Sequence, residues 1–529
     1  MTLCLAIAVT QPLQGKKQNL PISVARDISP GTNHEYAVQA RAGDLVAGTL
    51  VSRGAPLSAS LHDHVTSEGR PLQVSSAGRI GFIASSSGTY RLKLALIGTQ
   101  QGSYTLSLNP PLAPSARMRD VHVQPHDSYQ SERLVRLARD VQAKRIGGVE
   151  QFWDEVHNAG GYLIEPLRQI DQEPGRPPDD VLVTFFWKAT YETYNVLFSW
   201  FGSARAEDYY MSHLAGTNVW YKTLRVYRDS RFSYTLSPND SPDDRVMTSQ
   251  LDPGNPISAY EGSVSVFQTE DAPVDWSKFK PRRSGEVEEK RFESALLKGS
   301  YPAWIYTPPG YADNGDVNPL VILFDGAGYA GNFDRRNVLT PTMLDNLIDQ
   351  GRMRPTVVCF LGGFRESRGL APHNETSSDA VATELVPFLK SLYAISSNPR
   401  DVVIGGYSAG GTKASLIALK YPAVFGNVLS QSGAFRGPAD TYEPNFISRL
   451  FVRAERVPVR FYLDAGLYDP GGSVRADDES NTAGNRHFRD VLQAKGYEVV
   501  YRETGGAHEF VHFSATLAQG LMALLNPIK

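Results

Sequence analysis

The sequence has few features of disulfide-rich, membrane-spanning or nucleic-acid-binding proteins. It contains two cysteines among 529 residues, Cys4 and Cys359. Cys359 lies in the apolar run 356–361, which favours a buried thiol over a disulfide. The formal net charge is −3, with both signs interspersed, and no stretch reaches the roughly 20 apolar residues of a membrane span. We therefore expect no nucleic-acid partner and no membrane span.

A short apolar segment at residues 3–9 resembles the central part of a signal peptide, although no Lys or Arg precedes it. Residues 1–29 are interpreted as a possible leader and linker. This segment favours a periplasmic location, with the cytoplasm as the alternative. The sequence contains no internal repeat, and it does not indicate an oligomeric state.

The chain is longer than a single hydrophobic core usually supports, so we expect several domains. Short alternating runs at residues 30–112 predict a small β-sandwich, and residues 113–148 are expected to be a helical linker. Aromatic and β-branched runs at residues 149–280 predict a second β-sandwich-like domain. A charged linker is expected at 280–290. Residues 290–529 alternate apolar runs with helical stretches, which is typical of a mainly parallel sheet covered on both faces.

One motif in the last domain carries the strongest chemical signal. The apolar run 402–404 leads into Gly406-Tyr407-Ser408-Ala409-Gly410, and an amphipathic segment follows. A strand, a sharp turn and a helix in this order present a serine at the edge of a sheet, and the flanking glycines remove side-chain clashes. The alternative is a purely structural glycine-rich turn. We predict that Ser408 is a nucleophile.

A nucleophilic serine needs a base, and α/β-hydrolases supply it in the chain order serine, acid, histidine. His508 follows the predicted strand 499–502 and is our expected general base. Asp469 follows the predicted strand 459–463 and is our expected acid. Asp464, at the end of that strand, is the next alternative, followed by Asp477 and Asp478.

An oxyanion hole requires two backbone N–H groups that point at the carbonyl oxygen. The residue after the nucleophile, Ala409, should supply one of them. The glycine-rich turn that follows the run 320–324 should supply the other, and we assign it to Ala327. A tight turn without a catalytic role is the alternative for Ala327.

A second motif competes with this interpretation. Residues 508–512 read HEFVH, which matches the HExxH pattern of helical zinc sites. However, Gly505 and Gly506 place His508 in a loop or at a helix start, and no third ligand follows at a recognised spacing. We therefore expect no metal and no cofactor, and we interpret Glu509 and His512 as helix-start and packing residues.

The chain resembles the enterochelin esterase family, the esterase-D-like α/β-hydrolases that hydrolyse ferric enterobactin and related catecholate siderophores. In the N-terminal part of the resemblance, the matching segments are GVEQFW at 148–153, VTFFW at 183–187, MSHLAGTNVW at 211–220, RFSY at 231–234 and DPGNP at 252–256. In the hydrolase part they are residues 323–326, 406–411, 429–433 and 505–508. In addition, the leading module resembles the small β-domains of secreted bacterial peptidases, through residues 42–45, 87–90 and 102–106.

The resemblance implies a serine esterase that cuts the lactone esters of a catecholate siderophore, with iron present only as part of the substrate. A ferric tris-catecholate carries about three negative charges, which guanidinium groups bind through planar forks. We expect substrate contacts from at least one of Arg335, Arg336, Arg365 and Arg368. Trp187 and Trp220 are expected to be core residues. The family's Arg-x-x-Glu-Leu-x-x-Asn stretch is altered at 365–374, which leaves the preferred siderophore open.

Two other functions remain alternatives. One is an esterase of the same fold that acts on feruloyl or acetyl-xylan esters. The other is a siderophore-binding protein without catalytic activity.

Overall fold

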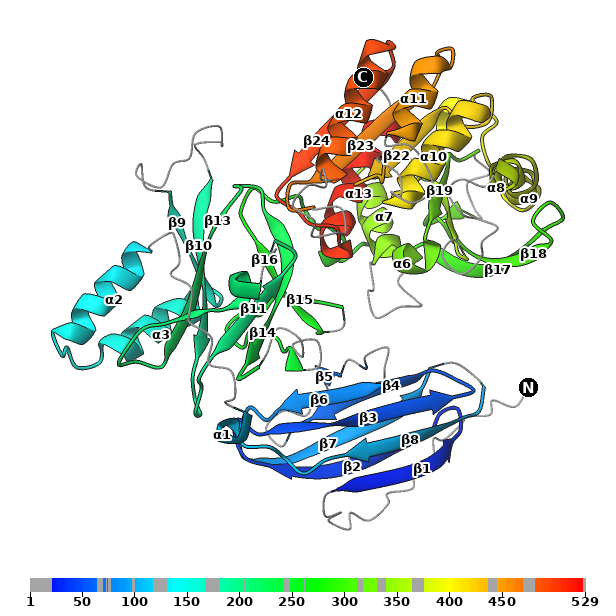
Figure 1. Cartoon of the computed structure of the whole chain (residues 1–529). Coiled ribbons are helices and arrows are strands. Elements are labelled where there is room, and N and C mark those ends of the chain that lie inside the picture. Colours follow the sequence, from blue (N-terminus) through cyan, green and yellow to red (C-terminus); the bar gives the residue numbers. More distant parts are fainter. Residues whose placement is uncertain are drawn as a thin grey trace. The chain divides into compact units, whose positions relative to one another are not determined.

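The computed structural model describes residues 21–63, 70–72, 74, 78–97, 100–117, 131–167, 180–202, 206–240, 248–260, 262–311, 317–330, 339–363, 375–435, 445–469 and 481–526 (Figure 1). The chain divides into two compact units. Met1–Val226 and Ser233–Val266 form the first, and Tyr227–Phe232 and Phe267–Lys529 form the second. The six residues Tyr227–Phe232 therefore belong with the C-terminal unit, although the strands on either side of them belong to the first.

The leading module consists of two four-stranded sheets that share one core. The first sheet has the order β1 (Ile22–Ile28), β8 (Gly102–Leu108), β3 (Leu45–Arg53) and β6 (Arg79–Ile83). The second has the order β2 (Asn33–Ala40), β7 (Gly88–Leu96), β4 (Leu57–His62) and β5 (Arg70–Pro71). In strands such as β7 and β8 alternate residues point inward, and Leu50 and Leu106 of the first sheet lie in the same hydrophobic cluster as Val38 and Leu92 of the second. A short helix, α1 (Pro114–Arg117), follows β8.

The second module also has two four-stranded sheets. One contains β12 (Ser212–His213), β13 (Val219–Val226), β10 (Val181–Lys188) and β9 (Tyr162–Pro166), in that order. The other contains β11 (Val196–Trp200), β14 (Arg231–Pro238), β16 (Val264–Gln268) and β15 (Ser258–Ala259). The rings of Phe185, Phe198 and Tyr234 pack together with centroids 4.6 to 5.1 Å apart, and they join strands of both sheets. Trp187 and Trp220 are only 5% and 3% exposed, as expected of core residues.

Two helices precede these sheets. α2 (Glu132–Gln142) begins at Ser131, whose hydroxyl accepts a hydrogen bond from the N–H of Leu134. This is the N-terminal cap expected of serine at that position. α3 (Gly148–Asn158) follows, and Phe152 and Val156 on its buried face share a cluster with Leu134 and Leu137 of α2. A short 3₁₀ turn, η2 (Ala206–Tyr209), lies between β11 and β12.

The C-terminal unit is built on one eight-stranded sheet. In spatial order its strands are β17 (Glu286–Ser294), β18 (Gly299–Thr307), β20 (Val357–Leu361), β19 (Leu320–Phe324), β21 (Val402–Tyr407), β22 (Asn427–Gln431), β23 (Arg460–Gly466) and β24 (Glu498–Thr504). The six strands from β20 to β24 run parallel. β18 is antiparallel to β20, and β17 pairs antiparallel with β18 at the edge of the sheet. Cys359 of β20 is a fully buried free thiol, and burial raises its pKa to about 12. The prediction of a buried thiol is therefore confirmed.

Helices cover both faces of this sheet. One face packs against η5 (Val381–Leu385), α9 (Val386–Leu392), α10 (Ala409–Lys420), α11 (Phe446–Arg453) and α12 (Asn481–Ala494), which share a single hydrophobic cluster with the strands. α8 (Glu375–Ala380) directly precedes η5. On the other face, α13 (Phe510–Leu525) lies so close that a Cβ on its Gly520 would meet Leu429 and Tyr462 at 2.8 Å. α7 (Thr340–Asp349) packs beside α13.

The prediction of a linker across 280–290 is wrong in its second half. β17 begins at Glu286 and pairs with β18 along its whole length. Its charged side chains suggested a solvated linker, but an edge strand with an exposed face carries the same composition. The preceding segment contains the 3₁₀ turn η3 (Trp276–Lys278), and η6 (Pro399–Asp401) precedes β21.

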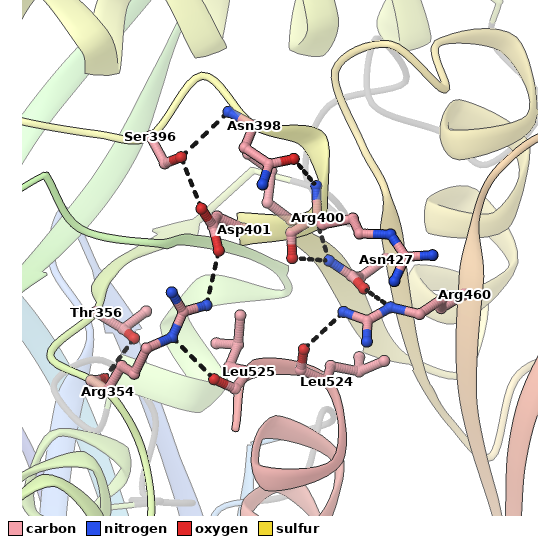
Figure 2. A network of polar contacts seen from close by, with 11 residues as sticks. Arg354, Thr356, Ser396, Asn398, Arg400, Asp401, Asn427, Arg460, Leu524 and Leu525 are labelled. Carbon is pink, nitrogen blue, oxygen red and sulfur yellow. Dashed lines mark hydrogen bonds and ion pairs between the residues drawn. The ribbon is translucent and has the colours of Figure 1, made fainter. Parts of the chain in front are cut away.

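A polar network joins the amino-terminal ends of the parallel strands to the end of α13 (Figure 2). Arg354, before β20, donates hydrogen bonds to the carbonyl of Leu525 and to the carboxylate of Asp401. Arg460, at the start of β23, donates to the carbonyl of Leu524 at 2.9 Å and to Asn427 at 2.8 Å. Because the last carbonyls of a helix have no partner within the helix, these two arginines cap α13.

Across the described ranges, no helix has the length and apolar character needed to cross a membrane.

Candidate active site

Ser408 lies at the sharp turn between β21 and α10, at the carboxyl-terminal edge of the sheet. Its backbone has φ 53° and ψ −122°, a conformation that non-glycine residues rarely adopt. Its N–H donates to the carbonyl of Gln431, and its carbonyl accepts from Ala434. Glycine is required at position 411, just after the turn, because a Cβ there would lie 2.1 Å from the hydroxyl oxygen of Ser430. Ser408 is thus partly exposed and strained. It lies on a sharp turn between a strand and a helix, as the sequence predicted.

His508 and Asp469 come together at the same edge. Nδ1 of His508 lies 2.8 Å from Oδ2 of Asp469, whose side chain is fully buried, whereas the His508 side chain is 26% exposed. A carboxylate at Nδ1 selects the tautomer that carries the proton there, which leaves Nε2 with a lone pair to accept a proton. The His508 ring lies edge-on against Tyr407, the residue before Ser408, with centroids 6.3 Å apart.

The alternative acid, Asp464, is placed differently. β23 continues to Gly466, so Asp464 lies inside the strand and is 1% exposed. Its Oδ1 accepts from the N–H of Ser432 at 3.3 Å. Burial raises the pKa of Asp464 to about 7, and the nearby Asp469 carboxylate adds to this shift. Asp469 is therefore the carboxylate that forms a hydrogen bond with His508. Asp464 instead accepts from the backbone N–H of Ser432, which follows β22.

The predicted oxyanion residues occupy the first turns of two helices at this edge. Ala409 is the first residue of α10, and Ala327 is the second residue of α6 (Gly326–Ala330). Such N–H groups have no acceptor within their own helix. β19 and β21 are parallel neighbours, so the segments that follow them emerge side by side. Gly326 fits there because a Cβ would lie 2.3 Å from the backbone carbon of Phe360. The sequence predicted a turn at Ala327, and the structure places a short helix there.

Several predicted residues fall outside the described ranges. These are the four arginines proposed to contact substrate, Arg335, Arg336, Arg365 and Arg368, and the two alternative acids, Asp477 and Asp478.

The HExxH segment does not form the helical pair that its pattern suggests. α13 begins at Phe510, so His508 precedes the helix while His512 lies within its first turn. His512 is 1% exposed, and burial lowers its pKa to about 4. Its ring packs against Gly506, where a Cβ would lie 1.9 Å from Nδ1. His512 is thus a buried residue under the loop that carries His508.

The structure adds contacts that the sequence did not predict. Nδ2 of Asn481, at the start of α12, lies 3.4 Å from Nδ1 of His508 and from Oδ2 of Asp469. Tyr468, beside Asp469, uses its hydroxyl to accept from the N–H of Tyr227. The only sequence feature near the Tyr227–Tyr468 contact was the RFSY segment at 231–234. It belongs to the family resemblance but does not indicate which residues it contacts.

Two parts of the chain match known protein families. Residues 294–524 match the family described as putative esterase, and residues 182–277 match the family described as enterochelin esterase, N-terminal. Iron(III) enterobactin esterase of Escherichia coli K12 is 27% identical over 346 residues, covering 60% of this chain and 82% of the relative. The enzyme of the same name from Dickeya dadantii is 26% identical over 431 residues, covering 72% and 93%.

Solved structures show the same fold. Ferric enterobactin esterase from Salmonella typhimurium superposes with a TM-score of 0.56 at 23% identity, covering 71% of this chain and 98% of that chain. The enterobactin esterase from Shigella flexneri, determined in the presence of enterobactin, gives 0.55 at 24% identity, covering 72% and 98%.

Proposed function

Because the chain belongs to the enterochelin esterase family and is a carboxylic ester hydrolase, we propose that it hydrolyses the lactone esters of a catecholate siderophore of the enterobactin type. The observation that carries the proposal is the Asp469–His508 hydrogen bond beside the strained Ser408 turn. The match to the enterochelin N-terminal family favours a siderophore as the substrate. An esterase that acts on feruloyl or acetyl-xylan esters needs no such module.

In the proposed mechanism, Oγ of Ser408 attacks the ester carbonyl carbon while Nε2 of His508 takes its proton. Asp469 holds the imidazole in position and stabilises the cation that forms. The N–H groups of Ala327 and Ala409 donate to the oxyanion of the tetrahedral intermediate. Collapse of the intermediate expels the seryl alcohol of the lactone, which receives the proton from His508. Water then attacks the acyl-enzyme by the same route and restores Ser408.

The proposed substrate is an anion that already contains an iron ion. A ferric catecholate is an anion of about three charges, and Arg335, Arg336, Arg365 and Arg368 follow the strands that end at this edge. Iron enters only as substrate cargo, and no cofactor is assigned to the reaction.

We also propose the identity of the modules. The two sheets of the leading module and those of the second module are each interpreted as a β-sandwich, and the eight-stranded unit as an α/β-hydrolase domain. The boundaries proposed from the sequence are 30–112, 149–280 and 290–529, with the last now extended to include β17. A periplasmic location stays a prediction, which cell fractionation tests.

The proposal is tested with purified wild-type protein and the Ser408→Ala variant, each incubated with ferric and iron-free enterobactin, with products separated by chromatography. We expect the wild type to release linear and monomeric catechol-serine units. The variant should turn over at least about 10³-fold more slowly while still binding the substrate. Hydrolysis of feruloyl esters in preference to enterobactin would favour the other esterase. Binding without hydrolysis and without fluorophosphonate labelling of Ser408 would favour a non-catalytic binding protein.

A further inference from the structure

A β-turn far from Ser408 in the sequence contacts both loops that carry the acid and the histidine. The turn connects β13 to β14, and the N–H of Ser230 donates to the carbonyl of Tyr227 at 3.1 Å. The segment Tyr227–Phe232, which includes the first two residues of β14, groups with the C-terminal unit, whereas β13 and the rest of β14 do not. Its contacts with the catalytic loops therefore lie within one compact unit.

The histidine loop is held by two hydrogen bonds to the turn. Oδ1 of Asp229 accepts from the N–H of Gly505 at 2.9 Å, and the N–H of Arg231 donates to the carbonyl of Gly505 at 2.8 Å. Both polar groups of the Gly505 backbone are thus used by the turn. Only glycine fits at 505, because a Cβ there would lie 2.3 Å from the hydroxyl oxygen of Ser230.

The acid loop is held through the Tyr468 side chain. Its hydroxyl accepts from the N–H of Tyr227 at 2.9 Å and lies 3.0 Å from the hydroxyl of Ser230. The N–H of Tyr468 in turn donates to the carbonyl of Gly506 at 2.9 Å. Tyr468 therefore connects the turn, the acid loop and the histidine loop. It is adjacent to Asp469 in the sequence, and its partner Gly506 is two residues from His508.

Arg231 anchors the turn against the helix that follows His508. Its Nε donates to the carbonyl of Val511 at 3.0 Å, and its Nη2 pairs with Asp275 at 2.7 Å. Both side chains are largely buried, at 4% and 11% exposure. A buried pair of this kind defines one arrangement of the groups around it, because a misplaced charge would be desolvated without a partner.

We infer that the turn Tyr227–Arg231 is a positioning element for the Asp469–His508 pair. This inference rests on the proposed function of Ser408, His508 and Asp469. Asp229 and Tyr468 act through the two loops, so they set the geometry of the pair without touching the reacting atoms. A segment far from Ser408 in the sequence but in the same compact unit then contributes to the chemical step.

The test uses the full-length protein and a compact ester, p-nitrophenyl acetate, which needs little gripping by the N-terminal module. Tyr468→Phe keeps the ring and removes the bridging hydroxyl, and Asp229→Ala removes the acceptor for Gly505. In each variant we expect kcat to fall about 10- to 100-fold, with KM changed less than about threefold, because small displacements of catalytic groups cost rate more than binding. The rate of Ser408 labelling by a fluorophosphonate should fall in parallel.

Asp229→Asn should restore most of the rate, because its amide oxygen still accepts from Gly505. Asp271→Ala is the matched control, since it removes an exposed ion pair with Arg228 of the same turn and none of the turn's contacts with the two loops. Thermal melts show which variants are folded. If Tyr468→Phe does not fold, the comparison of Asp229→Ala with Asp229→Asn tests the inference by itself. Wild-type labelling and kcat in Asp229→Ala, or an effect confined to KM, would overturn the inference while leaving the esterase intact. A wild-type protein that neither labels at Ser408 nor cleaves any ester would overturn both.

Discussion

Asp464 and Asp469 lie five residues apart at the end of the same strand, yet only Asp469 reaches His508, at 2.8 Å. Asp464 is held inside β23, where it bonds to the backbone of Ser432. The strand ends at Gly466, so the chain turns between the two carboxylates and presents them in different directions. Because both carboxylates are buried, the two residues make a matched pair for testing whether the contact with His508 matters for catalysis.

Replacing Asp469 by Asn should lower kcat by about 10³- to 10⁴-fold with little change in KM, because an amide no longer stabilises the imidazolium or selects the productive tautomer. Asp464→Asn should keep kcat within about tenfold of the wild type. Steady-state kinetics on a compact ester measures both. Equal losses in the two variants would argue against the assignment of Asp469 as the acid.

The stability of the protein should depend on the protonation of Asp464. Burial raises its pKa to about 7, above the ordinary value of 3.8. Between these values the folded state holds a proton that the unfolded state releases, so the free energy of unfolding falls as the pH rises through this window. Asp464→Asn removes the titration and should flatten the dependence. Urea denaturation of both proteins at pH 5 and pH 8 provides the comparison, and identical pH slopes would contradict the expectation.

The cap at the end of α13 should contribute measurably to stability (Figure 2). Arg460→Met removes the charged donor to the Leu524 carbonyl and to Asn427 and leaves both acceptors buried. We expect a loss of roughly 2–4 kcal/mol in the free energy of unfolding. Arg282→Met removes an exposed pair with Asp349 and should change it little. Urea titrations of the two variants measure the difference, and equal effects would show that the cap is not stabilising.

Gly506 and His512 should be energetically coupled. A Cβ at 506 would lie 1.9 Å from Nδ1 of His512, so Gly506→Ala must displace the ring or the His508 loop. We expect a loss of about 1–3 kcal/mol in stability and a lower kcat. The additional change His512→Ala makes room for the new methyl group, so the double variant should lose less than the sum of the single variants. Strict additivity in denaturation experiments would show that the two residues do not share this contact.

Much of the catalytic unit could be predicted because its signals are local. The run 320–324 is β19 in full, and β21 starts at Val402 as predicted. A buried parallel strand needs a continuous apolar run, and a serine turn needs adjacent glycines, so both can be recognised from neighbouring residues alone. The charged strand β17 was missed because an edge strand lacks such a run.

The sequence by itself determined the sharp turn at Ser408 and the strand that leads into it, because short-range sterics and hydrophobic periodicity specify them. Only the tertiary structure decided which carboxylate meets His508, that a short helix begins at Gly326, and that Asp229 and Tyr468 contact the loops that carry His508 and Asp469. These contacts join segments as much as 276 residues apart in the chain, as between Asp229 and Gly505. Such pairings depend on how whole elements pack, and no local pattern of residues encodes them.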